Sequence, residues 1–196
     1  MKTTPRLLAI FLMALVSTAS GAETDDLLAK ANGGDAAAQY DIGQKYAKGD
    51  GVAKNMEEAV KWLTKSAEQG NADAQMSLGA LYVSGRGVPK NSTEAAKWYR
   101  LAAEQGRPAA QVQMARMHLA GAGVVKDDVE AAKWASLAQT QGEGQANRIL
   151  VLVRSRMTAE ETARSEALVR DFTGKKTTDD AASGVPLVAP PLESAE

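Results

Sequence analysis

Residues 71–106, NADAQMSLGALYVSGRGVPKNSTEAAKWYRLAAEQG, decide the fold of this chain, because the sequence on either side nearly repeats them. Residues 35–70 read DAAAQYDIGQKYAKGDGVAKNMEEAVKWLTKSAEQG, and residues 107–142 read RPAAQVQMARMHLAGAGVVKDDVEAAKWASLAQTQG. The three segments have the same length and align without a gap. A fixed period of about 20–50 residues indicates structural units that cannot bury their apolar faces alone and must stack on their neighbours. The sequence therefore predicts a repeat protein.

Each unit is predicted to form two helices joined by a Gly-x-Gly step. In the central unit, Ala74, Leu78 and Tyr82 recur at four-residue spacing, which is the apolar stripe of an amphipathic helix. Residues suited to begin and end this first helix recur in all three units: Asp35, Asn71 and Arg107 at its start, and Gly49, Gly85 and Gly121 at its end. The second helix has a capping box at its start and a glycine at its end: Asn55 with Glu58, Asn91 with Glu94 and Asp127 with Glu130, then Gly70, Gly106 and Gly142. Each unit is therefore predicted to be a helical hairpin.

These signals predict an all-α fold, a right-handed α-solenoid of three helix-turn-helix units with a half-unit at each end. The N-terminal half-unit ends at Gly34, and the C-terminal cap covers residues 143–173. In the cap, Thr158 and Glu161 form a further capping box for a last helix that we expect to end near Phe172. The repeat domain is thus expected over 23–173. The remaining residues, 174–196, contain three Pro and no aromatic residue, and are predicted to be disordered.

Residues 1–22, MKTTPRLLAIFLMALVSTASGA, have the pattern of a secretory signal peptide. Two basic residues precede an apolar run over residues 7–16, which is too short to span a membrane, and small residues follow. We expect cleavage between Ala22 and Glu23, with cleavage after Ala19 as the second choice. An uncleaved signal anchor is the alternative. The sequence therefore predicts a protein of the periplasm or a secreted protein.

The composition excludes several classes of function. The formal net charge is −1, so there is no electrostatic reason to expect a nucleic acid or an anionic membrane as partner. The chain has no Cys, which excludes disulfides, thiolate metal sites and cysteine nucleophiles. No cofactor, metal site or catalytic residue is predicted.

The glycines and the single histidine are better explained by structure than by chemistry. Gly85-Arg86-Gly87 lacks the third glycine and the preceding strand of a dinucleotide-binding loop, so it is predicted to be a turn. Gly79 stands beside the apolar stripe, where a small residue lets a neighbouring helix approach closely. His118 occupies the position of a tyrosine in the other units, and a helix-facing, partly buried role is favoured over proton transfer.

The three tryptophans, Trp62, Trp98 and Trp134, share one position of the repeat, next to small residues. Stacking of a ligand on these rings is the alternative to core packing. Their common position favours packing.

The unit resembles the Sel-one-like repeat family, a relative of the tetratricopeptide repeat. The residues of the central unit that carry the resemblance are Ala74, Leu78, Gly79, Tyr82, Gly85, Gly87, Val88, Ala95, Trp98, Ala102, Ala103 and Gly106. The first unit departs from the pattern at Ile42, and the third at Met114, Ala115 and His118. The resemblance implies an α-solenoid that acts as an adaptor between proteins, often in bacterial envelopes or secretory pathways, and no shared catalytic residues.

By analogy with tetratricopeptide arrays, the exposed face of the first helices is expected to line a concave groove that binds a partner. The residues predicted on this face are Tyr40, Gln44, Lys48, Met76, Ala80, Val83, Ser84, Val112, Arg116 and Leu119. Tyr40, Met76 and Val112 are equivalent by position and are predicted to form an apolar ribbon across the units. In the alternative, the capping helix or the tail covers this ribbon.

The sequence thus predicts a non-catalytic adaptor of the periplasm or envelope that binds a protein or peptide segment in its groove. One alternative is a structural part of an envelope secretion or polysaccharide machine, or a periplasmic immunity protein. A β-lactamase-like hydrolase is disfavoured, because the family members linked to that activity carry paired cysteines, and the repeats contain no Ser-x-x-Lys.

Overall fold

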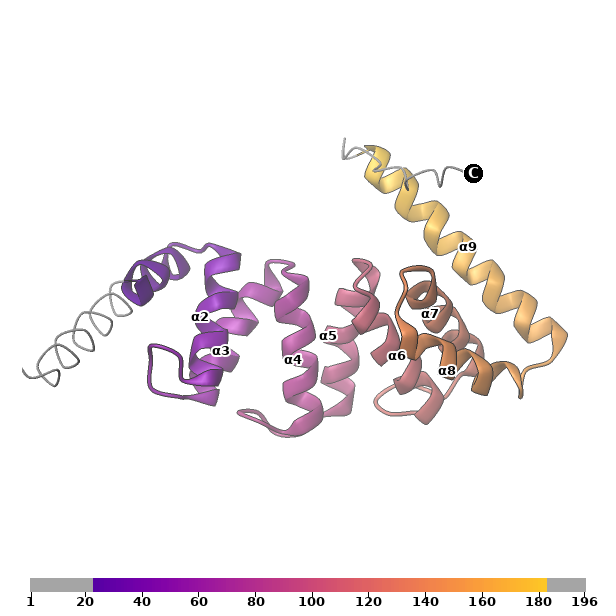
Figure 1. Ribbon diagram of the computed structural model, residues 1–196, viewed down its shortest axis with the longest axis horizontal. Helices are drawn as coiled ribbons and strands as arrows, with labels where there is room; N and C mark the ends of the chain where they lie inside the picture. The colour runs from indigo at the N-terminus through magenta and orange to yellow at the C-terminus, as the bar shows by residue number, and fades with distance from the viewer. Residues whose placement is uncertain (1–22, 183–196) are drawn as a thin grey trace, which may run out of the picture.

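The computed structural model describes residues 23–182 of the chain (Figure 1). The predicted signal peptide, its cleavage sites and residues 183–196 lie outside the described residues. All the regular structure between residues 23 and 182 is helical, which confirms the all-α prediction. After a helix over 23–32, the helices are α2 (Ala36–Lys48), α3 (Met56–Glu68), α4 (Ala72–Ser84), α5 (Ser92–Glu104), α6 (Pro108–Ala120), α7 (Asp128–Thr140), α8 (Gly144–Arg154) and α9 (Ala159–Ala182).

The predicted boundaries of the first helices, α2, α4 and α6, are confirmed. The side chain of Asn71 accepts hydrogen bonds from the backbone N–H groups of Asp73 and Ala74, and Asp35 caps α2 in the same manner. Arg107 makes no such bond, but Pro108 at the first helical position has no N–H to satisfy. Each of these helices ends at a glycine in the left-handed conformation.

The capping boxes of the second helices, α3, α5 and α7, form only in part. Asn55 accepts hydrogen bonds from the N–H groups of Glu57 and Glu58, as predicted. However, the N–H of Asn55 donates to the carbonyl of Tyr46 (2.9 Å), and Glu58 instead pairs with Lys61. The same arrangement recurs in the other two units. The folded-back loop therefore offers the N–H group a carbonyl at the end of the first helix.

Within a unit, the two helices are held close together by a small residue on the first helix. A Cβ atom added to Gly79 would lie only 2.5 Å from Cε1 of Tyr99, and one added to Gly43 would lie 2.9 Å from Cγ of Leu63. In the third unit, Ala115 and Ala135 are both fully buried. The predicted packing role of Gly79 is thus confirmed.

Consecutive units are joined by a buried glutamine, which the sequence analysis did not single out. The Gln75 side chain, 3% exposed, donates from Nε2 to the carbonyl of Ala67 in the preceding unit (3.1 Å). Its Oε1 accepts from Nε2 of Gln105 (2.7 Å) in its own unit. Gln39 and Gln111 make the same pairs of bonds. The signal for this ladder was the identical Gln at one position in all three repeats.

The C-terminal cap differs from a full unit. Helix α9 packs against α7, where Phe172 meets Trp134 edge to face at 5.6 Å between ring centroids, and it makes almost no contact with α8 (Figure 1). Thr158 and Glu161 form the complete capping box predicted for α9. The prediction that this helix ends near Phe172 is wrong, since it runs to Ala182. Extending a helix that is already nucleated requires no new nucleation step, and no Pro interrupts it before Pro186.

Replacing Gly87 with Ala should destabilise the protein. Gly87 has a φ of 76°, and an added Cβ would lie 2.6 Å from the backbone oxygen of Met56, at the start of α3. We expect a loss of about 1–3 kcal/mol, measured by urea denaturation. The control is Gly144→Ala, since a Cβ at Gly144 meets nothing within 4 Å. Equal effects of the two substitutions would contradict this account.

Replacing Gln75 with Met keeps the length of the side chain but removes its hydrogen bonds. Two hydrogen bonds at a buried junction are then lost, so we expect destabilisation of about 1–3 kcal/mol in thermal or urea unfolding. The matched control is Asn147→Met. Asn147 holds the equivalent position in α8 but is exposed, and its substitution should change stability by less than about 0.5 kcal/mol.

Candidate protein-binding surface

The structure brings the polar residues predicted for the groove to the place where neighbouring first helices meet. Nε2 of Gln44 on α2 donates to Oγ of Ser77 on α4 (3.1 Å). The guanidinium of Arg116 on α6 donates to the side-chain oxygen of Gln145 on α8. These bonds join α2 to α4 and α6 to α8, and Met76 of α4 packs on the cluster that contains Val112 of α6. The four first helices therefore present a common surface, which we call the first-helix face.

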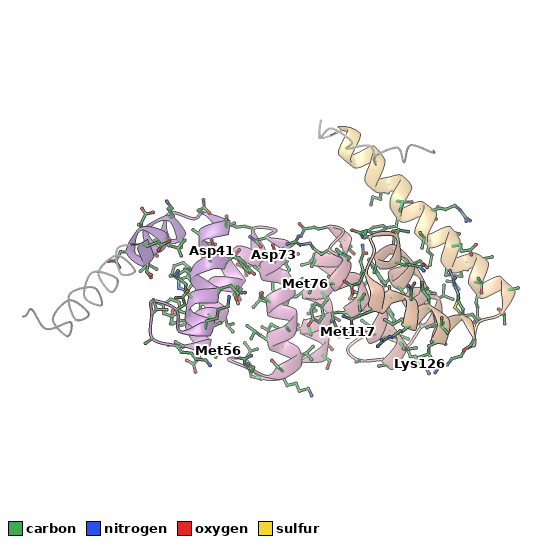
Figure 2. The ribbon with its side chains drawn as sticks, in the orientation of Figure 1. Asp41, Met56, Asp73, Met76, Met117 and Lys126 are labelled. Carbon is green, nitrogen blue, oxygen red and sulfur yellow. The ribbon has the colours of Figure 1, made fainter. Side chains whose placement is uncertain are left out.

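The predicted apolar ribbon is largely buried. Tyr40 is half-buried against the cluster that contains Leu78. Met76, which Figure 2 shows on α4, is half-buried against the cluster that contains Val112. Val112 is only 2% exposed, in one cluster with Ile149 and Leu150 of α8, so the prediction that it lies open to a partner is wrong. This position faces the next first helix. The longer Tyr and Met side chains reach partly beyond that contact, whereas Val is short enough to be covered.

Other predicted residues remain accessible on the first-helix face. Lys48, Ala80, Ser84 and Arg116 are exposed, Val83 is 43% exposed and Leu119 is partly buried. Oγ of Ser84 donates back to the carbonyl of Ala80 (2.8 Å), so this hydroxyl is engaged within α4. The accessible part of the face therefore has an apolar middle, formed by the alanine, valine and leucine, with a basic side chain toward each end.

His118 is buried as a packing residue, in line with the prediction. Its side chain is 6% exposed, and Nδ1 lies 3.2 Å from the carbonyl of Val125, which requires the proton on Nδ1. Nε2 is buried and has no hydrogen-bond partner within the described residues. Burial lowers the pKa of His118 below its ordinary value, and the bond to Val125 opposes this only in part. The imidazole is therefore held neutral in the folded state.

The tryptophans also serve packing. Trp134 is 2% exposed beneath α9, and Nζ of Lys133 lies 4.5 Å from its ring centroid. Nζ of Lys65 lies over Trp62 in a similar manner, at 4.2 Å. Trp98 is half-buried against the core of the second unit. All three rings therefore make packing contacts with the core clusters.

Residues 23–182 contain neither a cluster suited to bind a metal ion nor a helix suited to span a membrane. No group of three or more histidine or acidic residues there has an arrangement that suits a metal ion. None of the helices in this range combines the length and apolar character needed to cross a membrane.

The geometry defines an α-solenoid of helix-turn-helix units whose first helices share one surface. The model of the Sel1 repeat family matches residues 36–71, 72–106 and 108–143, each starting one residue after a unit predicted from the sequence. The chain therefore belongs to the Sel1 repeat family. The fold of this family generally mediates interactions between proteins.

Three similar proteins agree with this assignment. A Sel1 repeat protein from Oxalobacter formigenes has a crystal structure that matches with a TM-score of 0.62 and 41% identity, over 65% of this chain and 96% of that one. A protective antigen present in uropathogenic Escherichia coli strains, which displays an SLR fold, matches with a TM-score of 0.52 and 30% identity, over 88% of this chain and 45% of that one. A sel1-like repeat-containing protein of Acanthamoeba polyphaga mimivirus is 53% identical over 36 residues, which are 18% of this chain and 6% of that protein.

Neutral His118 should make stability depend on pH. Because its pKa is lower in the folded than in the unfolded protein, the unfolded state takes up a proton first as the pH falls. Its contribution is therefore complete above a pH of about 6.5 and is lost as the pH falls through that value toward the folded-state pKa. We expect the urea midpoint to drop less between pH 7.5 and pH 5 in His118→Tyr, which carries the residue of the other units, than in the wild type. Parallel pH profiles of the two proteins would contradict this prediction.

Proposed function

We propose that this protein is a non-catalytic adaptor of the periplasm or of secretion, and that it binds a segment of another protein along the first-helix face. The observation that supports this proposal is how the repeats vary. Several buried positions keep one residue in all units, as Gln39, Gln75 and Gln111 do, whereas those on this face differ: Gln44, Ala80 and Arg116 are equivalent, as are Lys48, Ser84 and Ala120. If this face served only to pack the units together, we would expect its residues to be the same in every unit.

The chemistry of the face favours a segment with an apolar centre. Val83 on α4 and Leu119 on α6 occupy one position of the repeat in adjacent units, so both belong to the first-helix face. Lys48 lies toward one end of the face and Arg116 toward the other, where carboxylates of a partner would pair with them. Docking of a helix or an extended segment by apolar anchors, with polar groups setting its direction, fits this arrangement.

Three units offer a small surface. An interface on part of one face of such a domain falls at the lower end of the sizes found for specific complexes. We therefore expect binding in the micromolar range, suited to a reversible and regulated contact.

The proposed location rests on residues 1–22, which carry the signal-peptide pattern. The Escherichia coli relative, of which this chain covers 45%, is a protective antigen, which accords with an exported protein.

The proposal is tested by capture of partners from an envelope extract with wild-type protein and with Val83→Glu. A charge in the apolar middle of the face should reduce the recovery of a specific partner at least tenfold, measured by quantitative mass spectrometry. Leu101→Glu is the matched control, because Leu101 is also 43% exposed but lies on α5, a second helix. Circular dichroism should show that both variants remain folded.

Two results would contradict the proposal. One is undiminished recovery of every partner with Val83→Glu, and the other is equal loss with Leu101→Glu. Substitution of Val112 by Glu would not be informative, since it would place a charge in the core.

A further inference from the structure

Each end of the array, within the described residues, consists of one helix of an incomplete repeat unit. At the C-terminal end, α8 is a first helix without a second helix packed along it. Val151 stands 36 residues after Ala115, at the position where Gly79 and Ala115 are covered by the second helix of their own unit. In α8 this residue is 74% exposed, and the neighbouring Leu152 is 41% exposed. Helix α9 follows in sequence but lies on α7 instead.

At the N-terminal end, the helix over 23–32 is a second helix without a first helix beside it in the described residues. Leu27 precedes Leu63 by 36 residues; Leu63 is buried by α2, whereas Leu27 is only partly buried. An open hollow of about 400 Å³ lies between this helix and α2, lined in part by Leu27, Glu23 and Asp41. Figure 2 shows Asp41 on α2 at this end of the molecule.

The two ends carry opposite charge. Helix α8 contains Arg148 and Arg154 and no acidic residue. The helix over 23–32 contains three acidic residues and one basic residue. Four acidic and three basic residues line the hollow, and two of the bases are paired: Lys30 with Asp26 (2.7 Å) and Lys45 with Asp50 (3.6 Å). Glu23 and Asp41 make no ion pair within residues 23–182, so the lining has a small net negative charge, opposite to that of α8.

We propose that the protein associates head to tail, with α8 of one copy entering the hollow beside the helix over 23–32 of a second copy. The pairing of a first helix with a second helix completes a repeat unit between two chains. It covers Val151 and Leu152, and it brings Arg148 and Arg154 toward Glu23 and Asp41. The surfaces involved are at opposite ends of the array (Figure 1). The hollow includes Gln44 and Lys48 at one end of the first-helix face, but not Val83, whose substitution tests the proposed function.

The contact joins different surfaces of the two copies, so each added copy leaves one free end of each kind. Such a heterologous contact that does not close produces linear chains rather than a fixed dimer. Val151 is larger than the Gly or Ala at its position in the full units, so α8 and its partner helix lie further apart than α4 and α5 do. Association is therefore weak and depends on concentration.

The experiment measures molar mass by sedimentation velocity over a range of concentrations, using the full-length gene product after its normal processing. We expect the wild type to show a mass that rises with concentration. Glu23→Arg with Asp41→Arg, or Arg148→Glu with Arg154→Glu, should each raise the dissociation constant at least tenfold. All four substitutions in one chain should restore association, because opposite charges then face each other again. Arg100→Glu with Lys126→Glu, a matched charge reversal of exposed residues elsewhere, should leave association unchanged.

Several outcomes would overturn the proposal. They are a single-chain mass at every concentration, association that survives reversal at either end, and a fourfold variant that does not recover although its circular dichroism is native. Association that appears only after deletion of residues 183–196 would contradict the proposal for the intact protein, because it would mean that this segment prevents the contact.

Discussion

The buried glutamine at each junction between units is the interaction on which the architecture depends. Gln75 reaches from α4 to the last turn of α3 and is held in place by Gln105 at the end of α5, so one amide connects three helices of two units. Its donor and its acceptor are both satisfied, which is the condition under which a buried polar group supports a specific geometry. The ladder fixes the register of each unit on the previous one, and the alignment of the first helices follows from that register.

The repeat made most of the fold predictable from sequence. Caps such as Asn71, closing glycines and the apolar stripe all signal local structure, and three copies in phase showed that these signals belong together. The position of α9 was not predictable, because Phe172 meets Trp134 through a tertiary contact that leaves no periodic trace. The exposure of Val112 was predicted wrongly for a related reason. The family pattern shows on which side of the helix a residue lies, whereas the burial of that residue depends on how far a neighbouring helix covers that side.

Comparison of the units also distinguishes the residues that stabilise the fold from those that are exposed and free to vary. Residues that recur, including the glutamines and tryptophans, have structural partners in the described chain, and His118 also proves to be a packing residue where the repeat departs from its pattern. The residues left for recognition are those whose identity changes between units while their exposure does not, with Val83 and Arg116 as examples. We therefore expect the function of such a protein to depend on the residues that differ between equivalent positions of its repeats, and composition alone does not reveal them.

The glutamine ladder also bears on how such a chain evolves. Each junction uses the same two hydrogen bonds and involves only adjacent units. An extra copy of residues 71–106 inserted after Gly106 would therefore form the same type of junction with the unit on either side. Recombination between neighbouring repeats can therefore lengthen or shorten the array without disturbing the units that remain. Because the face of the inserted unit is free to diverge, a duplication supplies new recognition surface while the inherited surface is kept.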